Sequence, residues 1–249
     1  MPSEQELNAF YEKDFFLNAR TGYQNYEKEQ RWRKRNACRD LELLQAFAQG
    51  GRLLDVGCAT GSFLSICKGH WECHGQEVST YAGKEAQTMF GDRIRIAPLK
   101  DIEYPANSFD AVTLWETINH MTDPFDDLRR IHHALKPGGI LALSVGDAGS
   151  WLAKRMGRYW YHVTPPIHAW YFTPKTFQTF FRENGFKMER IVYPGKYVDL
   201  GTCLARTRDA RDSRLLRKVH ERIASGRLGN LTLYLNLKDT MYVFARKIA

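Results

Sequence analysis

Between residues 51 and 146, short apolar runs alternate with longer segments of helical spacing. The apolar runs predict five strands, at Arg52–Val56, within Trp71–Val78, and at Ile94–Pro98, Phe109–Trp115 and Ile140–Val145. The segments between them predict helices at Ser62–Gly69, Thr80–Phe90 and Pro124–Leu135. Strands that alternate with helices at this spacing predict a parallel sheet covered on both faces. Ligands of such sheets bind at the carboxyl ends of the strands, beside the first strand.

The two flanks of this array have a different pattern. The first fifty residues mix aromatic and charged side chains and predict one or two helices that stop at Gly50-Gly51. After residue 146 a connection rich in Trp and Tyr, residues 147–172, precedes a predicted helix at Thr173–Asn184. Further strands are expected at Lys187–Val192 and Tyr242–Ala245.

Composition allows one large domain, and charge divides the chain. It has 249 residues, of which 43% are hydrophobic and 26% charged, so it can bury a core and is not of the disordered class. The formal charge of +8 is unevenly spread. Residues 1–50 are balanced, residues 51–150 carry 9 basic and 13 acidic side chains, and residues 151–249 carry 19 and 7. An acidic middle is therefore followed by a basic end.

Several features predict a cytoplasmic protein. The N-terminal stretch is polar and acidic and lacks the pattern of a secretory signal. No apolar run reaches the ~18 residues needed to span a membrane. The five cysteines are odd in number and lack CxxC spacing, which favours reduced thiols.

The turn Asp55-Val56-Gly57-Cys58-Ala59-Thr60-Gly61 lies between a predicted strand and a helix, the geometry of nucleotide recognition. A dinucleotide would require G-x-G-x-x-G, but Ala59 and Ser62 occupy the second and third glycine positions. Asp55 would also repel a phosphate, whereas it favours a cationic ligand. S-adenosylmethionine, which carries a sulfonium and an ammonium but no phosphate, fits this turn better than NAD does.

Glu77 supplies a second anchor at the end of the second predicted strand. It follows Asp55 by 22 residues. An acidic residue at this position can accept hydrogen bonds from both hydroxyls of a ribose. Together with the glycine turn, it predicts a nucleoside-containing cofactor.

Five stretches occur in order along the chain: Leu53–Leu64, Gly75–Ser79, Phe109–Thr113, His120–Pro124 and Leu135–Gly139. In these stretches the chain resembles the class I S-adenosylmethionine-dependent methyltransferases, over roughly residues 40–192. Within that superfamily it is most similar to bacterial enzymes resembling the ubiquinone-biosynthesis and glycan-cluster methyltransferases. Those relatives tend to carry a further pattern, matched here by Trp160, Pro166-Ile167-His168 and Tyr171-Phe172-Thr173.

The resemblance implies a Rossmann-like, doubly wound α/β fold. Its seven-stranded sheet would have an antiparallel last strand, with helices at the N-terminus and an aromatic and basic cap toward the C-terminus. The expected domains are an N-terminal helical lid, residues 1–50, and a methyltransferase domain, residues 51–249. That domain would comprise a cofactor half (51–146), an acceptor-side cap (147–172) and a basic insertion (206–227).

The resemblance also implies which residues bind S-adenosylmethionine. Around the methionine moiety it places Asp55, Gly57, Cys58, Ala59 and Gly61. Toward the nucleoside and the end of the fourth strand it places Glu77 on the ribose, Val78 and Leu99 beside the adenine, and Trp115 and Glu116. The chain departs from the family pattern at Ala59, where glycine is commoner, at Pro98, where many relatives have Asp, and at Asn119, which replaces a frequent Glu.

Methyl transfer to a hydroxyl requires removal of a proton, and histidine is the usual base near neutral pH. His120, after the fourth strand, and His168, in the aromatic connection, are the candidate catalytic residues. Each has an alternative role, His120 in loop packing and His168 in holding the cap. His132 and His133 lie on a predicted helix and are expected at the surface or in packing.

Three other features leave alternatives open. The cluster Cys67-x-x-His70-x-x-Cys73-His74 has zinc-like spacing, but it spans a helix end and a strand start, so no metal site is expected. Aromatic residues of the cap could stack on an acceptor or form a packed core. The basic insertion could bind phosphates, anionic lipid or RNA, or be a solvated amphipathic helix.

Taken together, these observations predict methyl transfer from S-adenosylmethionine, to an oxygen of a small-molecule, glycan or lipid-linked acceptor. The basic end favours an anionic acceptor and allows peripheral membrane contact. The alternatives are an RNA methyltransferase and an inactive cofactor-binding regulatory protein. Nucleic acid is disfavoured because the chain has no N-P-P-Y-like tetrapeptide, no catalytic-cysteine motif and no recognisable RNA-binding module.

Overall fold

The computed structural model describes residues 26–165, 168–201, 203, 229 and 231–248. The first half of the expected lid, the Pro166-Ile167 pair and the basic insertion at 206–227 lie outside the described residues. No described helix is both long enough and apolar enough to cross a membrane.

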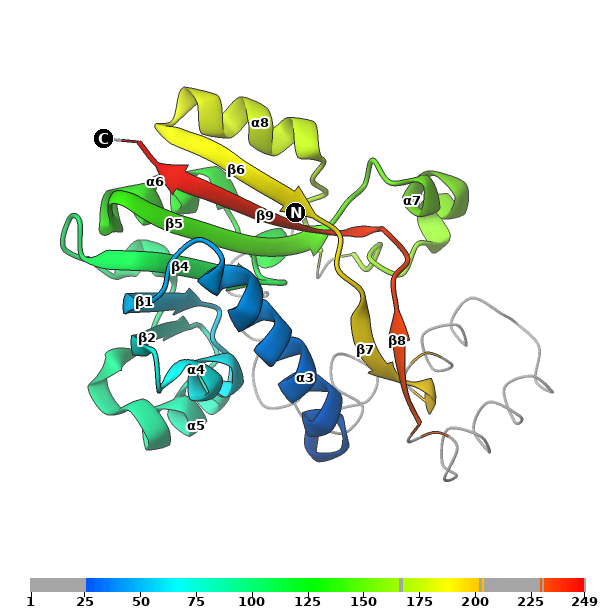
Figure 1. The fold of residues 1–249 in the computed structure, drawn as a ribbon, viewed down its shortest axis with the longest axis horizontal. Helices are drawn as coiled ribbons and strands as arrows, with labels where there is room; N and C mark the ends of the chain where they lie inside the picture. Colours follow the sequence, from blue (N-terminus) through cyan, green and yellow to red (C-terminus); the bar gives the residue numbers. More distant parts are fainter. Residues whose placement is uncertain (1–25, 166–167, 202, 204–228, 230, 249) are drawn as a thin grey trace.

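A seven-stranded sheet in the order β3-β2-β1-β4-β5-β9-β6 forms the centre of the molecule (Figure 1). Its strands are β1 (Gly51–Val56), β2 (Trp71–Glu77), β3 (Ile94–Ile96), β4 (Phe109–Trp115), β5 (Leu135–Gly146), β6 (Phe186–Val192) and β9 (Thr240–Lys247). β1 pairs in parallel with β2 and β4, and β3 and β5 extend the parallel sheet on either side. β9 lies between β5 and β6 and is antiparallel to both. The predicted doubly wound sheet with an antiparallel last strand is confirmed.

Helices cover both faces of this sheet, as the alternation of apolar runs and helical segments predicted. On one face lie α3 (Tyr26–Gln45), α4 (Ser62–Cys67) and α5 (Thr80–Phe90). On the other lie α6 (Pro124–Ala134) and α8 (Pro174–Glu183). Short 3-10 turns are η1 (Gly91–Arg93), η2 (Leu99–Asp101) and η3 (Ile118–His120).

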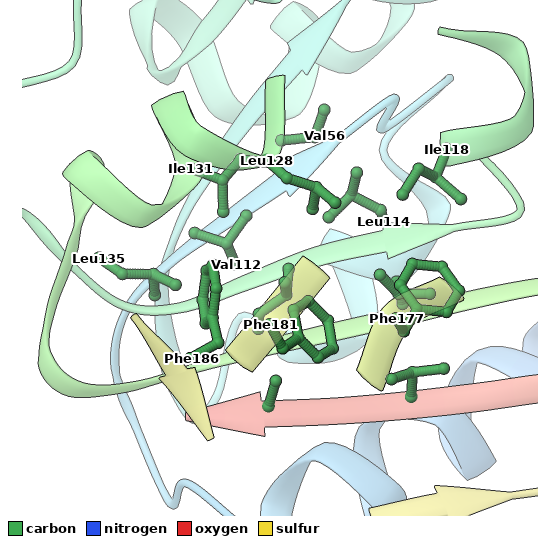
Figure 2. Close-up of a cluster of buried hydrophobic side chains, with 14 of the residues drawn as sticks. Val56, Val112, Leu114, Ile118, Leu128, Ile131, Leu135, Phe177, Phe181 and Phe186 are labelled. Atoms are coloured by element: carbon green, nitrogen blue, oxygen red, sulfur yellow. The ribbon is translucent and has the colours of Figure 1, made fainter. Parts of the chain in front are cut away.

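Neighbouring strand residues feed two separate cores, because successive side chains of a strand point to opposite faces. Leu53 packs with α3 and α4, whereas Leu54 packs with α6 and α8. Figure 2 shows the second core, in which Val112 and Leu114 of β4 lie among side chains of α6 and α8. Burial on both faces explains why the central strands are continuously apolar in sequence.

Two elements were not expected. A second, two-stranded antiparallel sheet joins β7 (Lys196–Asp199) to β8 (Thr232–Leu235). The aromatic connection contains the helix α7 (Trp151–Met156), whose first turn is capped by Ser150, followed by η4 (Gly157–Tyr159). In Figure 1, α7 and the β7–β8 pair lie beyond the arrowheads of β5 and β6, so they border the carboxyl ends of the parallel strands.

Other differences concern the ends of elements. α3 ends at Gln45, before the predicted stop at Gly50-Gly51. β5 begins at Leu135 rather than Ile140, because its pairing with β4 continues through a register shift between Phe109 and Ala111.

Candidate functional site

The glycine turn after β1 is folded tightly against the ends of β2 and β4. The amides of Gly57 and Cys58 both donate to the Gln76 carbonyl, at 2.8 and 3.0 Å. Gly57 has φ +73°, and a Cβ there would lie 2.5 Å from Cγ2 of Thr117. Gly61 (φ +77°) and Ala59 (φ +48°) are also left-handed. Ala59 thus keeps the conformation of the glycine that is commoner there, at a cost of roughly 1 kcal/mol.

Glu77, at the end of β2, links the glycine turn after β1 to the residues that directly follow β2. Its Oε2 accepts a hydrogen bond from the Ala59 amide at 2.8 Å, and its Oε1 accepts from the amides of Val78 and Ser79 at 2.9 Å each. The side chain is buried, and it lies at the carboxyl ends of β1 and β2. Its contact with a ribose remains a prediction, for which this placement is suitable.

Asp55, one residue before the end of β1, lies inside the sheet. The Thr113 hydroxyl of β4 donates to its Oδ1 at 2.7 Å. Burial raises the pKa of Asp55 to about 7, although this hydrogen bond acts in the opposite direction. Near neutral pH the carboxyl is therefore balanced between its neutral and ionised forms, and a cationic ligand nearby would favour ionisation.

The remaining predicted cofactor contacts on this side are largely apolar. Cys58 is buried, with Sγ 2.7 Å from where a Cβ on Gly75 would be, and burial raises the pKa of its thiol well above the ordinary value. Leu99 opens η2 and belongs to the core on the α6 side. Val78 follows β2 and is partly buried. These side chains offer packing surface rather than reactive groups.

Two buried polar atoms near the end of β4 lack a hydrogen-bond partner within the described part of the chain. They are Nε1 of Trp115 and Oδ1 of Asn119. Buried polar groups are normally paired, and unpaired ones occur at ligand sites. Together with two carboxylates, they form a group of mainly hydrogen-bond acceptors beside a left-handed backbone turn. Such a group fits S-adenosylmethionine, a ligand with hydroxyls, an amine and a positive charge, better than a pyrophosphate.

Glu116, directly after β4, has a left-handed backbone with φ +55°. Its amide donates to Ser144 of β5, to the carbonyl at 3.1 Å and to Oγ at 3.0 Å. Its carboxylate forms an ion pair with Lys196 of β7 at 2.5 Å. Burial alone would raise the pKa of Glu116, but Lys196, His162 and His168 outweigh it and lower the pKa to about 2. The carboxylate therefore stays ionised over the whole working pH range.

Helix α3 holds the backbone on both sides of Lys196. The Asn36 side chain donates to the Tyr197 carbonyl at 2.9 Å and accepts from the Tyr197 amide at 3.0 Å. Arg39 donates to the Gly195 carbonyl and, at 2.6 Å, to the hydroxyl of Tyr242. The described part of the expected lid thus positions a lysine that was not among the predicted site residues.

The structure brings the two predicted catalytic histidines together. The rings of His120, at the end of η3, and His168 lie 4.7 Å apart in an edge-to-face arrangement. Nδ1 of His168 is 2.5 Å from the carbonyl oxygen of His162, whose ring lies 5.9 Å from that of His168. His162 is buried and was not predicted as a site residue.

The aromatic cap is fixed by hydrogen bonds and divides into buried and exposed parts. Asp239 accepts from Nε1 of Trp160 at 2.7 Å and from the hydroxyl of Tyr161 at 3.1 Å. Nε1 of Trp170 donates to the Met121 carbonyl at 2.9 Å. In contrast, Trp151, Tyr159 and Tyr171 are exposed. The cap is therefore in part a packed core and in part free surface.

The zinc-like cluster has its side chains in different environments. Cys67 and Cys73 are buried in the core, whereas His70 is exposed. His74 contacts Glu72 at 2.8 Å. Within the described ranges no group of three or more His, Cys, Asp or Glu side chains is arranged to hold a metal ion. His132, in the last turn of α6, contacts the Gly185 carbonyl at 3.1 Å, beside the start of β6 and thus at the opposite end of the sheet from the site.

Comparisons with known proteins agree with this geometry. Residues 30–191 match a family model described as a methyltransferase domain. A ubiquinone/menaquinone biosynthesis C-methyltransferase from Geotalea daltonii is 26% identical over 133 residues, 49% of this chain and 57% of that protein. A tRNA U34 carboxymethyltransferase from Methylococcus capsulatus is 28% identical over 180 residues, 65% of this chain and 52% of that protein. An O-methyltransferase, cnsE, from Penicillium expansum is 27% identical over 152 residues, 57% of this chain and 54% of that protein.

The chain thus spans about half the length of the curated relatives it matches. Among solved structures, the YcgJ protein from Bacillus subtilis superposes with a TM-score of 0.60 at 15% identity, covering 85% of this chain and 99% of that one. At this identity the likeness shows the fold. Because the family model covers well over half of the sequence, the chain belongs to the class I S-adenosylmethionine-dependent methyltransferases.

Proposed function

We propose that the protein transfers a methyl group from S-adenosylmethionine to an oxygen atom of a small-molecule acceptor, with His168 as the general base. The observation that carries the proposal is the 2.5 Å contact between Nδ1 of His168 and the His162 carbonyl. A carbonyl oxygen only accepts, so in the neutral ring Nδ1 carries the proton and Nε2 carries the lone pair. Nε2 is then the atom that removes the proton of an acceptor hydroxyl.

The neighbouring ion pair supports this role for His168. An imidazolium forms when the base accepts a proton, and the ionised carboxylate of Glu116 is close enough to His168 for each charge to affect the other. Negative charge at this position stabilises the imidazolium. His120, in contact with the His168 ring, would help to orient it. Bound S-adenosylmethionine supplies the methyl group as an electrophile together with its own leaving group.

The position of Lys196 supports the proposal that the acceptor carries a negative charge. Its ammonium is ion-paired with Glu116 beside the histidines, and it is partly exposed. An acceptor that bears a carboxylate, a phosphate or an acidic hydroxyl would find a positive charge next to the proposed base. The glycan- or lipid-linked nature of the acceptor, and the cytoplasmic location, are further expectations of the same proposal.

On the cofactor side, the residues that would hold S-adenosylmethionine are those at the carboxyl ends of β1, β2 and β4. The turn from Gly57 to Gly61 would meet the methionine moiety, and Glu77 the ribose. Trp115 and Asn119 would offer to the ligand the polar atoms that have no partner among the described residues. The carboxylates among these residues suit the positive charge of the family's cofactor.

A second candidate function is methylation of RNA. It is favoured by the similarity to a tRNA U34 carboxymethyltransferase over 65% of the chain, and by the net positive charge of residues 151–249. An RNA substrate would use that basic end to bind phosphates.

The first experiment identifies the acceptor class. The full chain is incubated with methyl-labelled S-adenosylmethionine and cell extract, and the products are separated into metabolite, lipid and RNA pools. Label in metabolites or lipids, in an alkali-stable methyl ether or a labile methyl ester, supports O-methylation. Label only in RNA supports the second candidate, and a C-methyl product contradicts the oxygen acceptor. No S-adenosylhomocysteine across many extracts supports the inactive regulatory protein.

The second experiment tests the base, with the acceptor found in the first. We expect His168→Gln to lower kcat by about 10²–10⁴-fold, the usual contribution of a general base, while S-adenosylmethionine still binds in calorimetry. His132→Gln is the matched control, because it also removes a histidine that contacts a backbone carbonyl, at a distance from the site. A His168→Gln variant as active as this control would refute the role of His168.

A further inference from the structure

The segment formed by α7 and η4, residues 151–159, projects from the molecule. It stands apart from the sheet in Figure 1, and of its side chains only Ala153 is buried. Trp151 is 76% exposed and Tyr159 is 58% exposed. Covering side chains of this size and exposure with a partner is favourable, because it removes apolar surface from water.

Three exposed cations lie between these two aromatic residues. They are Lys154, Arg155 and Arg158, and residues 151–159 contain no acidic side chain. The guanidinium of Arg158 lies 4.9 Å from the centre of the Tyr159 ring. The segment therefore presents aromatic rings and a net positive charge on the same short element.

Two apolar residues of β8 and of the segment that follows it are also exposed, in a part of the chain that lies, like α7, beyond the arrowheads of β5 and β6 (Figure 1). Leu235 and Leu237 are both exposed. Asp239, two residues after Leu237, accepts hydrogen bonds from Trp160 and Tyr161, which directly follow η4. One buried carboxylate thus links the residues that follow η4 to the segment that follows β8.

We propose that residues 151–159, with Leu235 and Leu237, form a docking surface for an anionic lipid bilayer. Indole and phenol rings are well suited to the headgroup layer, because one end is apolar and the other polar. Lys and Arg attach such segments to anionic lipids and extend their charged ends to the headgroups. Sites for single-stranded nucleic acid instead follow a positively charged groove, whereas this segment is a short projecting helix.

The docking surface adjoins the candidate site. Residue 159 is followed by Trp160, Tyr161 and His162, and the carbonyl of His162 holds the ring of His168. A bilayer against the segment would place the candidate site close to the headgroup layer. The proposal concerns the surface alone and holds whichever acceptor the site uses.

The test measures binding of the full chain to two kinds of vesicle, pure phosphatidylcholine and an equal mixture of phosphatidylcholine and phosphatidylglycerol. We expect sedimentation with the mixed vesicles only, weakened by added salt. Changing Lys154, Arg155 and Arg158 together to Gln should lower the partition coefficient at least about tenfold, since each cation near an anionic surface strengthens binding severalfold. Trp151→Ala, with all three cations retained, should also weaken it.

The matched control changes Lys84, Lys175 and Lys187 together to Gln. These three exposed lysines lie on α5, α8 and β6, so the variant loses the same net charge elsewhere on the molecule. It should bind the mixed vesicles almost as well as the unmodified chain. Circular dichroism and S-adenosylmethionine titration establish that every variant is folded.

A separate readout reports on Trp151 itself. Brominated phosphatidylcholine in the mixed vesicles should quench part of the tryptophan fluorescence, and Trp151→Phe should remove that part. The proposal is overturned if the chain does not bind mixed vesicles, or if the two triple variants bind equally, which would place binding elsewhere, as in residues 206–227. It is also overturned if an RNA homopolymer displaces the vesicles while Trp151→Phe leaves the quenching unchanged.

Discussion

Glu116 combines a strained backbone with a well-defined set of partners. A left-handed conformation costs a non-glycine residue roughly 1–2 kcal/mol. Two hydrogen bonds from its amide to Ser144 hold that conformation, and the ion pair with Lys196 fixes the carboxylate. Strain of this kind persists where the surrounding structure determines it, and it is common at functional sites.

The function of this carboxylate can be tested by removing its charge and keeping its shape. Glu116→Gln should lower kcat about tenfold and shift the acid limb of the pH–rate profile to lower pH. The reason is that negative charge near the proposed base favours the imidazolium, and the Gln variant lacks that charge. Lys196→Met leaves the carboxylate in place and should raise KM for an anionic acceptor more than it lowers kcat. If both variants lose stability in urea without a change in the pH profile, the ion pair is only structural.

Asp55 provides a pH-dependent prediction. Its pKa is raised to about 7 in the folded chain and is about 3.9 when unfolded, so the folded state binds the proton more tightly. The contribution of Asp55 to the free energy of unfolding should therefore be greatest at low pH and should decrease as the pH rises from about 4 to 7. Asp55→Asn keeps an oxygen that can accept from Thr113 but cannot ionise. Without cofactor, the Asn variant should gain on the order of 2 kcal/mol over the parent between pH 5 and 8 in urea unfolding. Parallel stability profiles for the two proteins would contradict this placement of Asp55.

At the scale of elements, sequence pattern predicted the sheet and its covering helices because each signal was local. Apolar runs bounded by Gly and Pro marked the central strands, and side chains such as Ser79 and Thr173 mark helix starts as caps. The glycine turn and Glu77 were also local signals, at the end of recognisable strands. His120 was proposed from its type and its position after the fourth strand, whereas His168 was proposed from the resemblance to a known family, in the aromatic connection after the fifth strand.

The elements that the sequence did not predict lack such signals. β7 and β8 have four residues each, and their side chains are partly exposed, so neither shows a buried apolar face. α7 has six residues, of which three are exposed and one is buried. Lys196 meets Glu116 across 80 positions of the chain, and no local pattern indicates that contact. Long-range pairing of short, half-exposed elements depends on the whole fold rather than on sequence pattern.

The interface between α3 and β7 leads to a prediction at this scale. Asn36 makes two hydrogen bonds to the backbone of Tyr197, as a neighbouring strand would, and so holds the residue next to Lys196. Asn36→Ala should lower the free energy of unfolding by about 1–2 kcal/mol and speed amide exchange in β7 and β8. Asn184→Ala is the control, because Asn184 also makes two side-chain hydrogen bonds, at the end of α8. Unchanged exchange in β7 would show that α3 does not hold this strand.

At the scale of the whole molecule, the fold shows where part of the charge of the acidic middle and of the basic end lies. The carboxylates of Asp55, Glu77 and Glu116 lie at the carboxyl ends of β1, β2 and β4. Among the described cations of the basic end, those on α7 and β7 lie beyond those strand ends (Figure 1), whereas others are on α8, β6 and β9. The position of the cations on α7 and β7 is consistent with the proposed anionic acceptor, and the three carboxylates are consistent with a cationic cofactor.

Tyr242 connects the N-terminal helix, the central strand and the last strand, and a change there tests whether these parts form one unit. It lies buried on β9, its hydroxyl accepts from Arg39 of α3 at 2.6 Å, and its ring centre is 5.5 Å from that of Trp115 of β4. Tyr242→Phe keeps the ring but leaves the largely buried guanidinium one partner short, so stability should fall by about 1–3 kcal/mol. Tyr104→Phe is the matched control, because the buried hydroxyl of Tyr104 has no partner among the described residues, and its removal should be neutral or stabilising.

Urea unfolding, followed by Trp fluorescence and by far-ultraviolet circular dichroism, measures the effects of Tyr242→Phe and Tyr104→Phe. Equal losses for the two variants would show that the Arg39–Tyr242 contact contributes nothing, whereas separate transitions in the two signals would show that α3 unfolds independently of the sheet.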